Sequence, residues 1–135
     1  MALVLLYNIP EGEKLRRIRV ALLRQGIASR TVTYPEYGHP LGYLAGLDGF
    51  APGEEYHGED FCAEMLVMSG LPSQQFSALL DTLRASRATV TLKAVVTETN
   101  AQWDSLTLYR ALQEEHDTMR ELLAFRAKTK GKKKK

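Results

Sequence analysis

Two short polar turns contain the side chains best suited to bind a ligand, and each turn follows an apolar run. The first is Ser69-Gly70, where a glycine ahead of a helix leaves backbone N–H groups free to bind an anion. The second begins at Thr97, and its hydroxyls, amide and indole could orient a polar ligand and stack on it. A third apolar run ends at Asn8. The candidate ligand-binding residues are therefore Asn8, Ser69, Gly70, Thr97, Thr99, Asn100 and Trp103.

Each turn also has a purely structural explanation. A single glycine before a helix is typical of a tight turn, and neither phosphate-binding glycine motif is present. Thr99 and Gln102 fit the capping-box pattern, in which two side chains satisfy free backbone donors at a helix start. On that interpretation Trp103 packs against the domain. The turns therefore indicate a fold with a candidate site attached.

The usual catalytic groups are not arranged for a recognisable reaction. His39, His57 and His116 lack the spacing of a helical metal-binding pair, so we expect no metal site and no cofactor. Cys62 begins an apolar run, where we expect it to be buried, and no nearby base would activate it. No G-x-S-x-G motif supports a serine nucleophile. Whether the protein is an enzyme stays open on these residues.

Apolar patterning predicts four strands and three helices that would position the turns. The strands have apolar or β-branched composition, and the second alternates like an edge strand. The helices carry apolar residues at helical spacing. Strands are expected at 2–7, 29–34, 63–68 and 90–96, and helices at 10–26, from 72 onward and at 105–127.

The connection between the second and third strands, residues 35–61, differs in composition from the rest. It contains six of the ten glycines, three of the five prolines and five aromatic side chains. A loop of this length is unusual for linkage alone. A short helix is expected within residues 40–47. The segment either packs as an irregular cover over a sheet face or serves as a ligand lid or partner surface.

Two sheet topologies fit this order of elements, because each strand–helix–strand unit should be a right-handed crossover. In one, the strands are parallel in the spatial order second, first, third, fourth, with helices on both faces. In the other, the long connection reverses direction and gives an α+β ferredoxin-like sheet with one bare face. The first and third strands are apolar on both faces, which favours the former. We predict a small four-stranded, mostly parallel α/β sheet flanked by helices, with a long C-terminal helix.

The topology decides where Asn8 lies. If the first and third strands are parallel, Asn8 borders the same crevice as Ser69 and Gly70, where open α/β sheets bind ligands. In the ferredoxin-like alternative, Asn8 lies at the opposite end of the sheet. The turns that begin at Ser69 and Thr97 share one end in both topologies.

Length and composition indicate one domain over residues 1–127 and a disordered Lys-rich tail at 128–135. No apolar run reaches the ~20 residues that span a bilayer, and no signal peptide is recognisable, so we expect a cytoplasmic protein without a membrane partner. The tail holds six lysines, and the other twelve basic side chains face sixteen acidic ones, a net of −4. A basic first helix and the tail could contact phosphates, but no nucleic-acid motif accompanies them, so nucleic acid is not the expected partner.

The predicted C-terminal helix is longer than its own domain needs. At 1.5 Å per residue, a helix over residues 105–127 spans about 34 Å, against about 17–20 Å for a typical strand. Its last turns would lack cover from their own domain and would either fray or dock on a second subunit. The residues of a homodimer contact would be Met119, Leu122, Leu123 and Phe125.

Short motifs run through most of the chain. They are Leu5-Leu6-Tyr7-Asn8, Pro40 to Gly46, Glu64 to Leu71, Leu79 to Arg84, Leu92 to Trp103 and Leu108 to His116. On these motifs, residues 3–116 resemble a family of small bacterial proteins known only as a domain of unknown function. The resemblance implies no known activity, substrate or cofactor.

Three functions remain open. Since no catalytic constellation is recognisable, we expect a non-catalytic module that binds a small ligand or a protein partner. The second is a small enzyme or anion-binding subunit that uses the strand-end crevice. The third is a nucleic-acid-associated protein that uses the first helix and the Lys tail.

Overall fold

A four-stranded sheet forms the centre of the computed structural model, which describes residues 2–116 of the chain. β1 pairs in parallel with β2, and β3 pairs in parallel with β4, whereas β1 and β3 are antiparallel. The predicted order and the mostly parallel character of the sheet are therefore confirmed. The strands are β1 (Leu3–Tyr7), β2 (Ala28–Val32), β3 (Met65–Ser69) and β4 (Leu92–Val95), in the order β2-β1-β3-β4.

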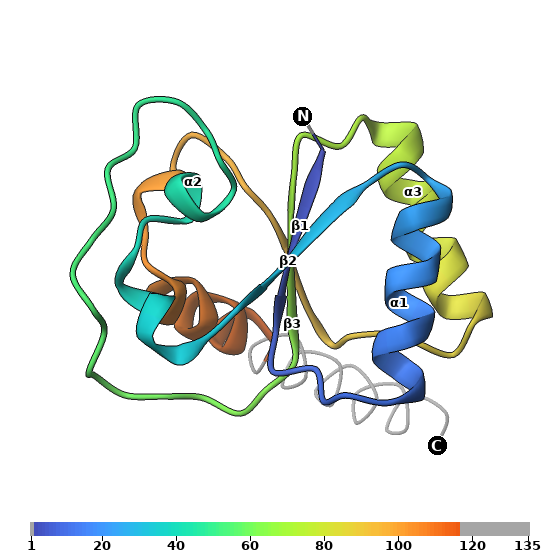
Figure 1. Cartoon of the computed structure of the whole chain (residues 1–135), viewed down its shortest axis with the longest axis horizontal. Helices are drawn as coiled ribbons and strands as arrows, with labels where there is room; N and C mark the ends of the chain where they lie inside the picture. Colours follow the sequence, from blue (N-terminus) through green and yellow to red (C-terminus); the bar gives the residue numbers. More distant parts are fainter. Residues whose placement is uncertain (1, 117–135) are drawn as a thin grey trace, which may run out of the picture.

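The antiparallel centre corrects the prediction that the first and third strands run in the same direction. Leu3 lies opposite Ser69, and Tyr7 lies opposite Met65. Both central strands are apolar on both faces because both faces are covered (Figure 1). Covered antiparallel strands have the same composition as parallel ones, so composition could not reveal the direction. The bare face of the ferredoxin-like alternative is equally absent from the part of the chain that the structure describes.

Two helices, α1 (Glu13–Arg24) and α3 (Ser73–Ala85), lie side by side on one face of the sheet (Figure 1). Their inward residues pack with β1 and β3 into one apolar core. Burying each large apolar side chain stabilises the fold by about 1.5–3 kcal/mol. The buried helix residues are Leu15, Ile18, Ala21, Leu22, Leu79 and Leu83.

The two helices run in opposite directions, because each is the crossover of a strand pair and the two pairs are antiparallel. Two hydrogen bonds tie them together. The Gln75 amide donates to the carbonyl of Gln25 over 2.9 Å, and the Arg17 guanidinium donates to the carbonyl of Ser86 over 3.1 Å. The C-terminal end of α1 therefore lies beside the N-terminal end of α3.

The other face of the sheet is covered by the long connection and by the C-terminal part of the described chain (Figure 1). The connection contains the 3₁₀ helix η1 (Tyr34–Gly38) and the short helix α2 (Leu41–Leu44). Aromatic rings fill this layer. Phe61 stacks on Tyr37 with ring centroids 4.9 Å apart and on Tyr109 with centroids 4.2 Å apart. We call residues 33–64 the cover segment.

A second 3₁₀ helix, η2 (Asn100–Gln102), precedes the C-terminal helix. That helix begins at residue 105, as predicted, and its first turn is capped by Asp104, whose carboxylate accepts the backbone N–H of Thr107 over 2.8 Å. Within residues 2–116, no helix is long and apolar enough to cross a membrane. The predicted continuation to residue 127 and the Lys tail lie outside the described residues, as do the proposed dimer contacts Met119, Leu122, Leu123 and Phe125.

Candidate functional site

The antiparallel centre of the sheet divides the predicted ligand-binding residues between its two ends. Asn8 follows β1 and lies beside the start of β3, whereas Ser69 is the last residue of β3. The Thr97 turn follows β4, which is parallel to β3, so it lies at the same end as Ser69. A single crevice lined by all of the predicted residues is therefore wrong, and the prediction that the Ser69 and Thr97 turns share one end is right.

Asn8 fastens the cover segment to the end of β1. Its backbone is left-handed, with φ 58°, a conformation that asparagine tolerates better than most residues. Its side-chain amide donates to the carbonyls of Phe61 and Ala63 over 2.8 Å and 3.1 Å. Its side-chain oxygen accepts from the Tyr37 hydroxyl over 3.4 Å. Asn8 therefore has a structural role, because its hydrogen bonds join the end of β1 to the cover segment.

The Ser69-Gly70 turn is a tight turn between β3 and α3. Ser69 is only 3% exposed, and Gly70 has φ 74°, a left-handed conformation that favours glycine. The backbone N–H of Val96 donates to the carbonyl of Met68 over 2.8 Å and joins the two strand ends. The glycine is therefore explained by backbone geometry without a ligand.

The side chain of Asn100 closes the turn after β4. The backbone N–H of Thr97 donates to the Asn100 side-chain oxygen over 2.8 Å, and the Asn100 N–H donates to the Thr97 hydroxyl over 3.1 Å. The Asn100 amide also donates to the carbonyl of Val95 over 2.9 Å. The expected capping box between Thr99 and Gln102 is wrong, since the Thr99 side chain makes no capping bond.

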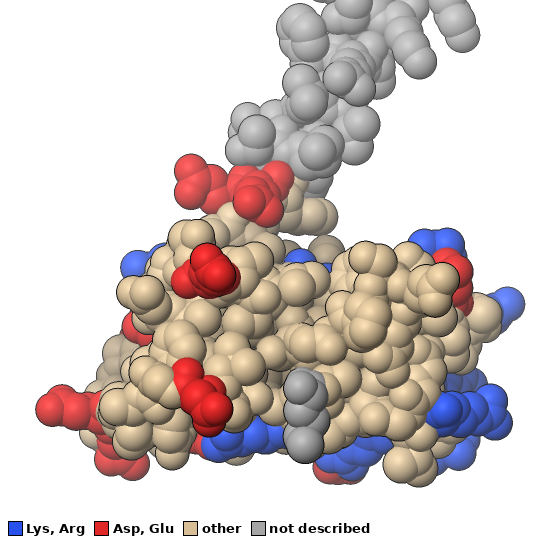
Figure 2. All heavy atoms as spheres, turned by 90° about the horizontal axis from the view of Figure 1, so that it is seen from above, with Lys and Arg blue, Asp and Glu red and all other residues tan. Residues whose placement is uncertain are grey.

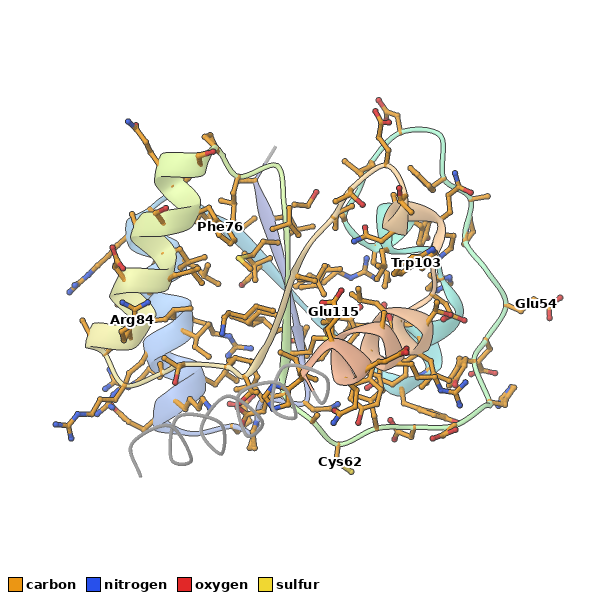
Figure 3. The ribbon with its side chains drawn as sticks, turned by 180° about the vertical axis from the view of Figure 1, so that it is seen from behind. Glu54, Cys62, Phe76, Arg84, Trp103 and Glu115 are labelled. Atoms are coloured by element: carbon orange, nitrogen blue, oxygen red, sulfur yellow. The ribbon has the colours of Figure 1, made fainter. Side chains whose placement is uncertain are left out.

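Trp103 belongs to the cover layer. Its half-buried side chain packs against the aromatic core on that face, where Figure 3 shows it beside the C-terminal helix. Its carbonyl accepts the backbone N–H of Leu41 over 2.9 Å. The backbone of Trp103 thus links η2 to the cover segment, and its side chain is packed, as the structural interpretation of the turn predicted.

Replacing Asn100 with alanine should destabilise the protein by about 2 kcal/mol, because two hydrogen bonds of a largely buried side chain are lost at about 1 kcal/mol each. Thr99→Ala is the matched control. It should change the unfolding free energy by less than about 0.5 kcal/mol, because the Thr99 side chain is exposed and makes no capping hydrogen bond. Urea denaturation of both variants measures the difference. Equal effects would contradict this structural role for Asn100.

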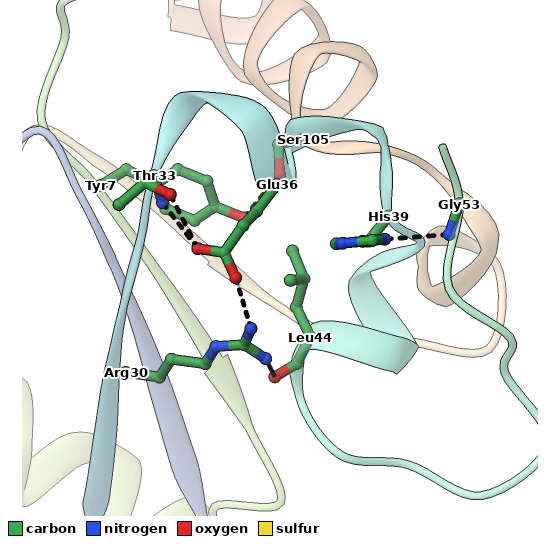
Figure 4. Close-up of polar contacts among 8 residues, drawn as sticks. All are labelled: Tyr7, Arg30, Thr33, Glu36, His39, Leu44, Gly53 and Ser105. Atoms are coloured by element: carbon green, nitrogen blue, oxygen red, sulfur yellow. Dashed lines mark hydrogen bonds and ion pairs between the residues drawn. The ribbon is translucent and has the colours of Figure 1, made fainter. Parts of the chain in front are cut away.

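A cluster of polar contacts holds the cover segment against β2 (Figure 4). The Arg30 guanidinium pairs with Glu36 and donates to the carbonyl of Leu44 over 3.2 Å. Burial raises the pKa of Glu36, but the hydrogen bonds from Thr33 and the charge of Arg30 outweigh it and hold that pKa below its usual value. All these groups are partnered within the fold, so the cluster is structural.

Tyr7 and Ser105 form a fully buried pair, with 2.7 Å between their hydroxyl oxygens (Figure 4). Burial raises the pKa of the Tyr7 phenol above its ordinary value, so it remains neutral. No described residue with a basic side chain bonds to either hydroxyl. The pair therefore joins β1 to the C-terminal helix and offers no activated nucleophile.

A groove of about 190 Å³ opens between α1 and α3 on the outside of the molecule. Its charged lining comes from three arginines of α1, and α3 contributes two hydroxyl side chains. We call this the α1–α3 groove. Its lining residues are Arg16, Arg17, Val20, Ala21, Arg24, Thr82 and Ser86.

The electrostatics of the groove leave positive charge available. Glu13 pairs with Arg16 over 2.5 Å and with Arg17 over 3.3 Å. The hydrogen bond from Arg16 lowers the pKa of the Glu13 carboxyl, which therefore stays ionised. No described residue pairs with Arg24. Three guanidinium groups and one carboxylate give a local net charge of +2.

The sequence revealed only half of this groove. The arginines of the first helix were recognisable as a basic face, but Thr82 and Ser86 belong to a distant helix. They meet the arginines only because α1 and α3 pack in opposite directions. No spacing pattern marks such a contact, and the topology that produces it was the part that composition left undecided.

Cys62, His39 and His57 do not form a cluster. Cys62 is exposed and points away from the fold (Figure 3), because β3 begins only at Met65. The expectation of a buried cysteine is therefore wrong. His39 accepts the backbone N–H of Gly53 over 2.9 Å, and His57 lies 3.3 Å from Glu55. Across residues 2–116, no three His, Cys, Asp or Glu side chains are grouped so that they could hold a metal ion.

Comparison with known protein families gives a match to part of the chain. The family model described as "Domain of unknown function (DUF3783)" matches residues 64–119, which run from the start of β3 into the C-terminal helix. The match leaves β1, α1, β2 and most of the cover segment outside. Neither curated proteins nor solved structures gave a match.

Proposed function

Since residues 64–119 belong to a domain family of unknown function, we propose from the geometry that this protein is a non-catalytic module that binds a small oxyanion of the phosphate class. The proposed site is the α1–α3 groove. The observation that carries the proposal is Arg24, which pairs with no residue in 2–116, beside two further arginines and two hydroxyl groups.

The lining chemistry suits a phosphate group. A guanidinium presents several N–H donors in one plane and can bond two phosphate oxygens at once. The hydroxyls of Thr82 and Ser86 can donate to the same ligand from the opposite wall. Because no carboxylate of the described residues pairs with Arg24, it is the side chain from which a bound oxyanion would gain most.

The same lining supports binding rather than catalysis. It contains no histidine, no cysteine and no lysine. Arg16 of the lining pairs with Glu13 and holds this carboxylate in its ionised form with a lowered pKa. A carboxylate of lowered pKa is a weak general base near neutral pH. The residues at the strand ends are less suited to an enzyme site than the groove. The side chains of Asn8 and Asn100 already donate hydrogen bonds to backbone carbonyls.

Calorimetric titration with inorganic phosphate and with pyrophosphate tests the proposal. Arg24→Ala should weaken binding by about tenfold or more, because one charge-assisted hydrogen bond contributes about 1.5–3 kcal/mol. Thr82→Ala should weaken it by a smaller factor. Arg19→Ala is the matched control, because it removes the same charge from the same helix but does not line the groove.

Ionic strength must be held constant with sodium chloride, since a general attraction to anions would also weaken in salt. Equal losses in Arg24→Ala and Arg19→Ala would indicate such a general attraction and would refute a defined site. Failure of both anions to bind would refute the proposed function outright.

A further inference from the structure

Two concavities meet on the surface of α1. The first is the α1–α3 groove, and the second is a larger hollow of about 560 Å³. Arg16 and Val20 line both of them, so they form one continuous surface. The rest of the second concavity is lined by α1 and by the turn that precedes it, with no contribution from α3. We call this second concavity the α1 hollow.

The two concavities differ in charge. The α1–α3 groove is lined by three arginines and by no carboxylate. The α1 hollow is lined by two arginines and by two carboxylates, Glu11 and Glu13, so its charges balance. Figure 2 shows Lys and Arg gathered mainly at the end of the molecule that the helices form. An anionic group should therefore prefer the groove, whereas the hollow suits an uncharged group.

The α1 hollow also exposes apolar side chains. Leu23 is 79% exposed and Val20 is 37% exposed. Both line the hollow, and Val20 lines the groove as well. A ligand that covers these side chains removes apolar surface from water, which favours binding.

Helix geometry places these apolar side chains next to the arginine of the proposed anion site. Val20 precedes Leu23 by three residues and Arg24 by four. It is therefore the neighbour of both on the surface of α1, with Cβ atoms about 5–6 Å apart. A ligand bonded to Arg24 can cover Val20 and Leu23 at the same time if its phosphate is joined directly to a small apolar group.

We propose that the α1–α3 groove takes a water-soluble phosphate monoester, with its phosphate on Arg24 and its apolar group over Val20 and Leu23 in the α1 hollow. This inference rests on the proposed function and narrows its ligand class from small oxyanions to organic phosphates. A phospholipid headgroup offers the same phosphate chemistry. An anionic membrane surface, however, would also approach the carboxylates of Glu11 and Glu13, which repel it.

Calorimetric titration with phenyl phosphate and with inorganic phosphate tests the inference, at about pH 8, where a phosphate monoester is a dianion. Phenyl phosphate should bind about tenfold more tightly, because its ring removes apolar surface from water. Phenol, which lacks the phosphate, should not bind detectably. Equal affinity for the two phosphates would overturn the inference, as would phenol binding as tightly as phenyl phosphate.

Leu23→Ala tests where the ring lies. The variant should lower the ratio of phenyl phosphate affinity to inorganic phosphate affinity by about threefold or more, since it removes apolar contact area. Because the Leu23 side chain is exposed, the variant should fold normally. Leu47→Ala is the matched control: it removes an exposed leucine from the cover segment, on the other face of the sheet, and should leave the ratio unchanged. The same ratio in both variants would show that the ring does not lie on Leu23.

The inference and the proposed function fail in different ways. If both phosphates bind equally and both depend on Arg24, the proposed function stands and the inference alone fails. If neither binds, the proposed function fails and the inference fails with it.

Co-sedimentation with vesicles of equimolar phosphatidylcholine and phosphatidic acid separates the two sources of a phosphate group. The protein should remain in the supernatant. Retention on these vesicles that is lost in Leu23→Ala would identify a membrane surface as the partner and would overturn the inference.

Discussion

Replacing Tyr37 with alanine should lower the free energy of unfolding by about 3–5 kcal/mol, the range for truncating a large buried aromatic side chain. Tyr37 is 1% exposed and lies at the centre of the aromatic layer. Its ring centroid is 4.9 Å from that of Phe61 and 5.8 Å from those of Tyr7 and Tyr56.

Tyr37→Phe is the matched control, since it keeps the ring and removes only the 3.4 Å hydrogen bond to Asn8. Its cost should be below about 1 kcal/mol, because a bond of that length is weak. Guanidinium denaturation measures both variants. Similar costs for alanine and phenylalanine would show that the hydroxyl, and not the ring, holds the cover in place.

The second large effect is expected from Asn8→Ala, at about 3 kcal/mol. Two hydrogen bonds to the carbonyls of Phe61 and Ala63 are lost, at about 1 kcal/mol each. Alanine must also adopt the left-handed backbone of φ 58°, which costs about 1–2 kcal/mol for a residue with a Cβ. Thermal and urea unfolding of the variant measure the sum.

Asn8→Gly separates these two contributions. Glycine loses the same hydrogen bonds but adopts the left-handed backbone without strain. It should therefore be more stable than the alanine variant by about 1 kcal/mol. If both variants unfold at the same denaturant concentration, backbone strain has no part in the role of Asn8.

The strands and helices were predictable because their patterns are local. The apolar stripe of α1 contains Leu15, Ile18 and Leu22, and all three are buried. The spatial order of the strands followed from the right-handed crossover rule. The direction of β3 relative to β1 depends on the path of a connection rich in glycine and proline, whose many turns carry no periodic signal. That one reversal moved Asn8 away from Ser69.

The candidate site was only partly predictable for a related reason. The Thr97 turn was placed correctly, but the side chain that closes it is Asn100 rather than Thr99. Thr99 matched a local capping pattern, whereas Asn100 bonds both to Thr97 and back to Val95 on β4. Contacts that depend on how a turn folds back on its strand are not encoded in spacing. Sequence patterns showed the basic face of α1 but not the hydroxyl groups of α3 that complete the α1–α3 groove.

The C-terminal ends of the two long helices have the same geometry with different residues. α1 ends with the N–H of Ile27 donating to Leu22, and α3 ends with the N–H of Ala88 donating to Leu83. In both cases the residue just before the N–H donor has a left-handed backbone. It is Gly26 after α1 and Arg87 after α3. Arg87 therefore carries a conformational free-energy cost that glycine avoids at this position. Arg87 is exposed and follows Ser86, which lines the α1–α3 groove.

The antiparallel meeting of β1 and β3 makes the sheet a pair of strand–helix–strand halves, each with a parallel strand pair. The segment that matches the family model contains only the second half. Without β1, one side of β3 has unpaired backbone groups, which favour addition of another strand. In this chain β1 therefore covers the edge of β3 that the second half alone would leave open.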